Sequence, residues 1–226
     1  MDIVEVKVSI MKDKFNLTRE QNVFIAKRNI VDYIWKSANL EGIAVTYPDT
    51  QVIFDGYSVQ GYKIEEITAI NNLKKAWQFI LNDIDLELNL AYICKINGIV
   101  GEGIFYNSGM IRSTPVKIGG TTWQPTIPFE SQIKEELDKV SGESNTERAI
   151  NMMLYLMRKQ IFLDGNKRTA MLIANKIMIE NGCGIISIPI DKQPEFYKLL
   201  IKYYETSNKE EIKEYIYNYC IDGMTF

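Results

Sequence analysis

The sequence predicts a mainly α-helical protein with one β-hairpin. Apolar residues recur at three- and four-residue intervals along most of the 226-residue chain, and only six prolines are present to interrupt helices. Residues 110–125 depart from this pattern, because residues near Met110 alternate with a period of two and Gly119 and Gly120 offer a tight turn. We therefore expect a helical bundle that carries a single hairpin.

The first helix is expected over about residues 18–42. Thr18 and Gln21 have the spacing of a capping box, and apolar residues follow at helical intervals until Gly42, which predicts about six helical turns. Residues 44–61 contain a proline and two glycines and are expected to be an irregular connection.

These features predict an N-terminal extension over residues 1–61, followed by the main domain over residues 62–226 with its C-terminal helices. Within the main domain, Ser144 and Glu147 are expected to cap a long helix. Residues 3–10 have a strand-like pattern. The other helices are expected at 64–81, 86–99, 130–140, 168–180, 193–204 and 209–219.

Composition excludes several classes of function. The chain has no histidine, which excludes Ser-His-Asp and Cys-His hydrolases and histidine-ligated metal sites. The net charge of −3 provides no general basic field for a nucleic-acid backbone, so no nucleic-acid partner is expected.

The expected compartment is the cytoplasm. The three cysteines are odd in number, widely spaced and without a CxxC pair, which favours reduced thiols over a disulfide framework. Residues 1–15 lack the pattern of a secretory signal. No uncharged apolar stretch approaches the roughly 20 residues of a membrane span, so no membrane partner is expected.

The segment Gln160 to Arg168 interrupts two strongly predicted helices and is the candidate functional loop. Unpaired N–H groups at a helix start, a glycine and the cations Lys167 and Arg168 all favour phosphate. Asp164 would repel phosphate unless a divalent cation lay between them, so the loop suits a Mg²⁺–nucleotide. A plain helix–loop–helix corner, with Asp164 and Asn166 as caps, is the alternative.

The run from Phe162 to Ala170 resembles the signature loop of the Fic/Doc (Fido) family, whose pattern is His-x-Phe-x-Asp/Glu-Gly/Ala-Asn-Gly/Lys-Arg. Seven consecutive motif positions match, and the resemblance extends from about residue 64 to residue 204. It implies a Fic-like helical bundle that binds ATP and Mg²⁺. Active members transfer AMP to a hydroxyl of a target protein, whereas Doc-type members phosphorylate.

Carried over to this chain, the resemblance assigns cofactor-binding roles to the loop. Asp164 would hold Mg²⁺, and Gly165 and Asn166 would form the anion hole within a loop that also includes Phe162. Arg168 would contact phosphate oxygens. Lys167 occupies the motif position where AMP-transferring members usually have glycine and the Doc branch has lysine, which favours phosphotransfer or binding alone.

Gln160 occupies the motif position of the catalytic histidine. A positioned base contributes about 10² to 10⁴ in rate, and a carboxamide has no useful pKa near neutrality. Gln160 could still orient a hydroxyl or a water. The resemblance therefore implies a nucleotide-binding protein with impaired or altered transferase activity, or a pseudoenzyme.

Residues Ser37, Glu41 and Gly42 resemble the family's inhibitory motif, Ser/Thr-x-x-x-Glu-Gly/Asn. In the family this glutamate pairs with a second motif arginine and blocks the γ-phosphate. That arginine is Met171 here, so we expect Glu41 to reach Arg168 and to lower ATP affinity. Removal of AMP from a target, with Glu41 as the base, is an alternative.

The predicted hairpin resembles the family's flap, whose free edge would present a target protein to the loop. Ile111 and Arg112 are its candidate target-binding residues. A structural hairpin that only covers the core is the alternative, and a nucleotide-independent protein-binding module is the rival function. Assembly into a homo-oligomer stays open.

Overall fold

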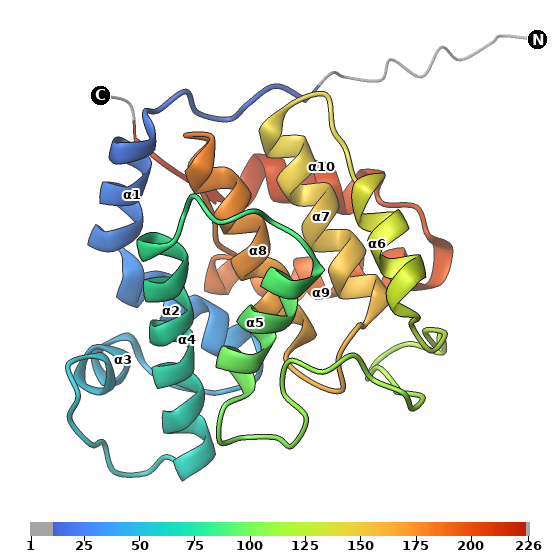
Figure 1. The fold of residues 1–226 in the computed structure, drawn as a ribbon. Helices are drawn as coiled ribbons and strands as arrows, with labels where there is room; N and C mark the ends of the chain where they lie inside the picture. Colours follow the sequence, from blue (N-terminus) through green and yellow to red (C-terminus); the bar gives the residue numbers. More distant parts are fainter. Residues whose placement is uncertain (1–10, 225–226) are drawn as a thin grey trace, which may run out of the picture.

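The computed structural model describes residues 11–224, and within them it is mainly α-helical, as predicted (Figure 1). Two short strands pair antiparallel, with Ile185 opposite Asp222 and Ile186 opposite Ile221. In chain order the elements are α1 (Arg19–Arg28), α2 (Ile30–Leu40), α3 (Tyr47–Phe54), α4 (Ile64–Asn82), α5 (Leu90–Gly101), α6 (Glu130–Asp138), α7 (Asn145–Lys159), α8 (Asn166–Glu180), β1 (Ile185–Ile186), the 3-10 helix η1 (Ile190–Lys192), α9 (Gln193–Thr206), α10 (Glu210–Tyr219) and β2 (Ile221–Asp222).

Helix α8 is the centre of the fold. It packs against α1, α4, α5 and α7, and Figure 1 shows it surrounded by these helices. Almost every residue of α8 is buried, including several polar ones. Its buried cation Lys176 donates to the carbonyl of Ile84 at 3.0 Å and to the carboxylate of Glu180 at 2.9 Å. The first residues of this enclosed helix follow the candidate functional loop directly.

The predicted helix over residues 18–42 is two helices. The capping box of Thr18 and Gln21 forms as expected, but the backbone at Asn29 has φ −107° and ψ 13°, which separates α1 from α2. The amide of Asn29 lies 3.5 Å from the carboxylate of Asp222 at the opposite end of the chain. The break is thus associated with a long-range contact that helical periodicity does not reveal.

Residues 44–61 are not entirely irregular, because they contain α3. The side chain of Thr46 accepts a hydrogen bond from the backbone N–H of Asp49, and Pro48 lies in the first turn. Both features are typical of a helix start. Pro48 was therefore a start signal rather than an interruption.

The hairpin expected between residues 110 and 125 is absent from the described structure as a pair of strands. The turn at Gly119 and Gly120 forms, but no strand is present on either side of it. The guanidinium of Arg112 instead donates to three carbonyl oxygens, those of Gln160, Thr114 and Thr126, at 2.6–2.7 Å. Three prolines between residues 115 and 128 also remove ladder donors.

The remaining predicted helices are present with small shifts. Helix α5 begins at Leu90 rather than at residue 86, because the side chain of Asn89 caps it by accepting from the N–H of Tyr92. The strand-like residues 3–10 lie outside the described residues. The boundary at residue 61 stays a prediction. Over residues 11–224, no helix combines the length and apolar character that a membrane crossing requires.

Candidate active site

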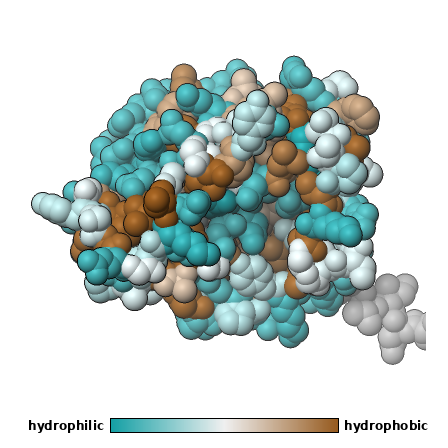
Figure 2. Space-filling view, turned by 90° about the horizontal axis from the view of Figure 1, so that it is seen from below, coloured by the Kyte–Doolittle hydropathy of each residue, from teal (hydrophilic) through white to brown (hydrophobic). Residues whose placement is uncertain are grey.

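The loop between α7 and α8 is bounded by two residues with left-handed backbone conformations. Gln160 has φ 50° and ends α7, and Gly165 has φ 73° and precedes α8. The loop borders a cavity of about 260 Å³ that is also lined by Glu41, Lys117 and Tyr197. Figure 2 views the molecule from the end on which this loop lies in Figure 1, and shows a hollow with hydrophilic residues flanked by hydrophobic ones.

Gly165 is required by both conformation and space. A Cβ at this position would lie 3.1 Å from the side-chain nitrogen of Asn97 and 3.1 Å from a methyl carbon of Val100. Left-handed φ is unfavourable for residues with a Cβ, so any other residue would strain the loop or displace α5. The close packing brings the loop backbone directly onto α5.

Asn97 holds this contact and was not predicted from the sequence. It is fully buried, and its amide donates to the carbonyl of Asp164 at 3.0 Å and to the hydroxyl of Thr169 at 3.1 Å. Its carbonyl accepts from the N–H of Gly109 at 2.8 Å. The available signal was a lone asparagine between the buried apolar residues Ile96 and Val100.

Asn166 closes the loop from the other side. Its side chain accepts from the N–H of Phe162 at 3.0 Å and donates to the carbonyl of Phe162 at 2.8 Å. The side chain of Phe162 is itself 2% exposed and lies in the core. Phe162 therefore contributes packing to the loop, and its contact with a cofactor stays a prediction.

The start of α8 offers backbone donors to the cavity. The N–H groups of Asn166, Lys167 and Arg168 have no acceptor among residues 11–224, and Gly165 provides no side-chain cap. The positive end of the helix dipole and the two cations add to these donors. These groups lie where the sequence predicts an anion site, and anion binding there stays a prediction.

Asp164 lies at the rim, with its side chain 59% exposed. One carboxylate oxygen accepts from the N–H of Gly165 and lies 3.4 Å from the guanidinium of Arg168. Among the described residues no group of three potential metal-ligating side chains occurs. Asp164 could therefore hold Mg²⁺ only together with oxygens from a ligand or water.

Gln160 uses both ends of its carboxamide inside the protein. Its nitrogen donates to the carbonyl of Met157 at 2.6 Å, and its oxygen accepts from the amide of Asn166 at 3.1 Å. The side chain lines the cavity but is committed to the loop. It can support the loop or orient a polar group, and it carries no titratable proton.

Glu41 lies over the start of α8. Its two carboxylate oxygens lie 3.8 Å from Nζ of Lys167 and 3.8 Å from Nε of Arg168, and the first of these oxygens has no hydrogen-bond donor among the described residues. Burial raises the pKa of the Glu41 carboxyl, and the two cations partly oppose this. The structure thus places Glu41 beside Arg168 as expected, and adds Lys167 as a partner that was not foreseen.

The other predicted regulatory residues lie next to Glu41. Ser37 is buried one turn earlier on α2, and Gly42 has φ 82°, which ends the helix directly after its C-cap residue, Glu41. Tyr197 of α9 donates through its hydroxyl to the carbonyl of Leu40 and supports the same helix end. The ammonium of Lys167 lies 5.1 Å from the centre of the Tyr197 ring.

Arg112 lies inside the protein rather than on an exposed edge. It is 2% exposed, its backbone N–H donates to the carbonyl of Ile161 at 3.0 Å, and burial lowers the pKa of its guanidinium. Arg112 therefore supports the loop from behind. The half-buried Ile111 packs against the core, and a role for either residue in target binding stays a prediction.

Part of the chain matches a known protein family, and the chain is similar to known proteins. Residues 87–178 match the model of the Fic/DOC family. The protein adenylyltransferase fic-1 of Caenorhabditis elegans is 25% identical over 205 residues, which are 84% of this chain and 40% of that protein. The protein adenylyltransferase Fic of Drosophila grimshawi is 23% identical over 225 residues, 93% of this chain and 45% of that protein. The chain thus spans less than half the length of these relatives.

Solved structures share the fold. Fic-1 from C. elegans superposes with a TM-score of 0.76 at 20% identity, covering 87% of this chain and 62% of the other. A Fic domain containing signaling protein from Bacteroides thetaiotaomicron has a TM-score of 0.72 at 16% identity, covering 89% of this chain and 86% of the other. The helices and the loop between α7 and α8 therefore belong to a fold that these proteins have in common.

Proposed function

We propose that this chain, whose residues 87–178 match the model of the Fic/DOC family, binds ATP or a related nucleotide with Mg²⁺ and transfers AMP to a target-protein hydroxyl poorly or not at all. The observation that carries the binding proposal is the uncapped start of α8, where three N–H groups lack an acceptor among residues 11–224 and where Asn166 and Lys167 line one small cavity. Phosphate is the ligand that this arrangement suits.

The residues present fit a Mg²⁺ that arrives with the nucleotide. Asp164 has one carboxylate oxygen without a partner among residues 11–224, and the side chain is exposed enough to reach a phosphate-bound cation. Mg²⁺ is commonly held by one or two carboxylates together with phosphates and water. When bound, the cation would neutralise phosphate charge, while Arg168 and the α8 amides would hold the phosphate oxygens.

Impaired transfer follows from Gln160. The attacking hydroxyl must lose a proton, and the carboxamide of Gln160 cannot accept one. Both ends of its carboxamide are also engaged in hydrogen bonds within the protein, which restricts the movement of the side chain toward a substrate hydroxyl. Positioning and anion-hole electrostatics are the contributions that this chain's own residues can still make.

Glu41 supports a second candidate, the removal of AMP from a target. It is the carboxylate beside the phosphate site, and burial raises the pKa of its carboxyl, which makes its ionised form a stronger base. In this reaction Glu41 would orient and deprotonate the attacking water. Lys167 in the cavity favours a third candidate, Doc-like phosphotransfer.

Calorimetric titration with ATP, with and without Mg²⁺, tests the binding proposal. We expect saturable binding that Mg²⁺ strengthens, and loss of the Mg²⁺ effect in Asp164→Asn. Asp138→Asn is the matched control, because Asp138 ends α6 at an exposed position outside the cavity. No binding by the wild type would contradict the proposal and favour a nucleotide-independent protein-binding module.

The reaction is tested separately with ATP labelled at the α or γ phosphate and a cell lysate. Transfer of α label would show AMP transfer, and transfer of γ label would show phosphotransfer. Release of label from a previously AMP-modified lysate would show removal. Each activity must disappear in Arg168→Ala to be assigned to this site.

A further inference from the structure

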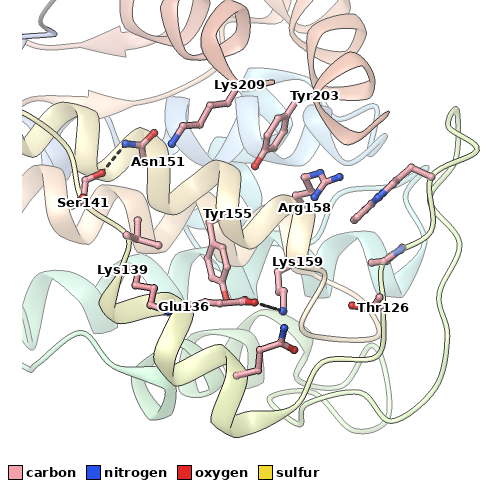
Figure 3. Close-up of a pocket in the computed structure, with 14 residues that line it drawn as sticks. Thr126, Glu136, Lys139, Ser141, Asn151, Tyr155, Arg158, Lys159, Tyr203 and Lys209 are labelled. Atoms are coloured by element: carbon pink, nitrogen blue, oxygen red, sulfur yellow. Dashed lines mark hydrogen bonds and ion pairs between the residues drawn. The ribbon is translucent and has the colours of Figure 1, made fainter. Parts of the chain in front are cut away.

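A second and larger cavity lies on the other side of the α7 end. It has a volume of about 590 Å³, which is in the usual range for ligand pockets. Figure 3 shows it between α6, α7, the end of α9 and the extended chain near Thr126. It does not share a lining residue with the cavity at the loop. Lys159 lines this cavity and the next residue, Gln160, lines the other.

The lining of this cavity is strongly cationic. Four cations and one carboxylate line it, although the whole chain has a net charge of −3. The single carboxylate, Glu136, is already occupied, because it lies 2.7 Å from the ammonium of Lys159 and accepts from the hydroxyl of Tyr155 at 2.8 Å. The cavity therefore has excess positive charge that its own lining does not balance. The four cations are Lys139, Arg158, Lys159 and Lys209.

Two of these cations have no carboxylate partner among residues 11–224, namely Arg158 and the half-buried Lys209. Burial and the neighbouring Lys213 lower the pKa of Lys209. Lys139 pairs only with Glu135 at an exposed position, where such pairs contribute little. A bound anion would relieve the repulsion among these groups.

The cavity also offers surfaces for a peptide chain. The guanidinium of Arg158 lies 4.4 Å from the centre of the Trp123 ring, and Tyr203 forms part of the wall. The side-chain oxygen of Asn151 is buried without a donor among residues 11–224. A backbone N–H of a bound peptide would supply the missing donor.

We propose that this second cavity binds an acidic segment of a protein partner, with its carboxylates at Arg158, Lys139 and Lys209. Binding itself is independent of the proposed nucleotide function. A corollary does rest on that function: a hydroxyl a few residues away in the same partner would reach the loop. The Trp123 ring stacks on Tyr204 at 5.8 Å, and Tyr204 lines the loop cavity, so the two sites are adjacent.

Fluorescence anisotropy with a labelled eight-residue peptide of alternating glutamate and glycine tests the proposal. We expect binding at least tenfold tighter than that of the glutamine-for-glutamate peptide, and weakening as salt is raised. Lys209→Glu should weaken binding at least tenfold, and Lys139→Ala should weaken it less. Lys198→Glu is the matched control, since it makes the same charge change at an exposed site of α9 outside the cavity, and should change affinity less than twofold.

Several results would overturn the proposal. Equal affinity for the two peptides would show that the carboxylates are not recognised. An equal loss of peptide affinity in Lys198→Glu and Lys209→Glu would show only general electrostatic attraction to the protein surface. Displacement of the peptide by citrate or inorganic phosphate at concentrations similar to its own would show a small-anion site instead. Thermal melting confirms that Lys209→Glu is folded, and Lys139→Ala provides the test if it is not. An ATP affinity of Lys209→Glu equal to that of the wild type would show that this site is distinct from the loop.

Discussion

Replacing Glu41 with glutamine should strengthen nucleotide binding. The carboxylate lies 3.8 Å from both Lys167 and Arg168, the cations that a phosphate would use. At an effective dielectric constant of about 20, each of these contacts corresponds to about 4 kcal/mol of attraction. A phosphate that binds these two cations must compete with the carboxylate of Glu41 for them. It is also repelled by the negative charge of Glu41, which stays close by.

The expected net gain is smaller than this gross attraction. Glutamine keeps the volume of Glu41 in the cavity of about 260 Å³, and solvent screens the phosphate. We expect ATP to bind about ten- to a hundredfold more tightly to Glu41→Gln, which corresponds to about 1.4–2.8 kcal/mol. Glu41→Gly, which removes volume as well as charge, should show at least this gain, and the difference between the variants measures the steric part.

Calorimetric titration of the three proteins with ATP and Mg²⁺ provides the measurement. The variants should remain folded at pH 7, because burial raises the pKa of Glu41 and ionised Glu41 therefore destabilises the folded state. Affinity that is the same for wild type, Glu41→Gln and Glu41→Gly would refute the inhibitory role. A gain in Glu41→Gly alone would show that obstruction by volume, and not charge, is the mechanism.

Further predictions concern the loop and its supports. Because the pKa of Glu41 is raised above its ordinary value of 4.5, the unfolding free energy of the wild type should fall as pH rises from about 4.5, and urea denaturation should show a smaller fall in Glu41→Gln. Gln160→His should raise label transfer from ATP by about 10² or more if the base is the missing element, and no gain would indicate a further defect. Gly165→Ala should cost about 1–2 kcal/mol in urea denaturation and weaken ATP binding, because its Cβ would press on Asn97 at a positive φ. Arg112→Ala leaves three carbonyls without their donor, so we expect a loss of about 3 kcal/mol, and a loss below about 1 kcal/mol would contradict its supporting role.

Local features of the fold were predictable because they depend on neighbouring residues. The capping box at Thr18 and the cap at Ser144 form as their spacing indicates. Helical periodicity located α4, α7 and α8, since each buries an apolar face over many turns. These are short-range signals, and tertiary packing agrees with them.

Features that depend on distant residues were not predictable. The break at Asn29 accompanies a contact with Asp222. The expected strands near Gly120 are absent among the described residues, and Arg112 instead donates to the distant carbonyls of Gln160 and Thr126. Asn97 could be noticed as a polar residue in an apolar helix, but not as the partner of Asp164.

The sequence by itself determined the chemistry available at the site. It showed an aspartate, a glycine, an asparagine and two cations at a helix start, and no histidine at position 160 or elsewhere. Only the tertiary structure decided which of these groups are free. The carboxamide of Gln160 is hydrogen-bonded to Met157 and Asn166. Glu41 is over a hundred residues away in sequence, yet its carboxylate lies beside both Lys167 and Arg168, because both cations project from the first turn of α8.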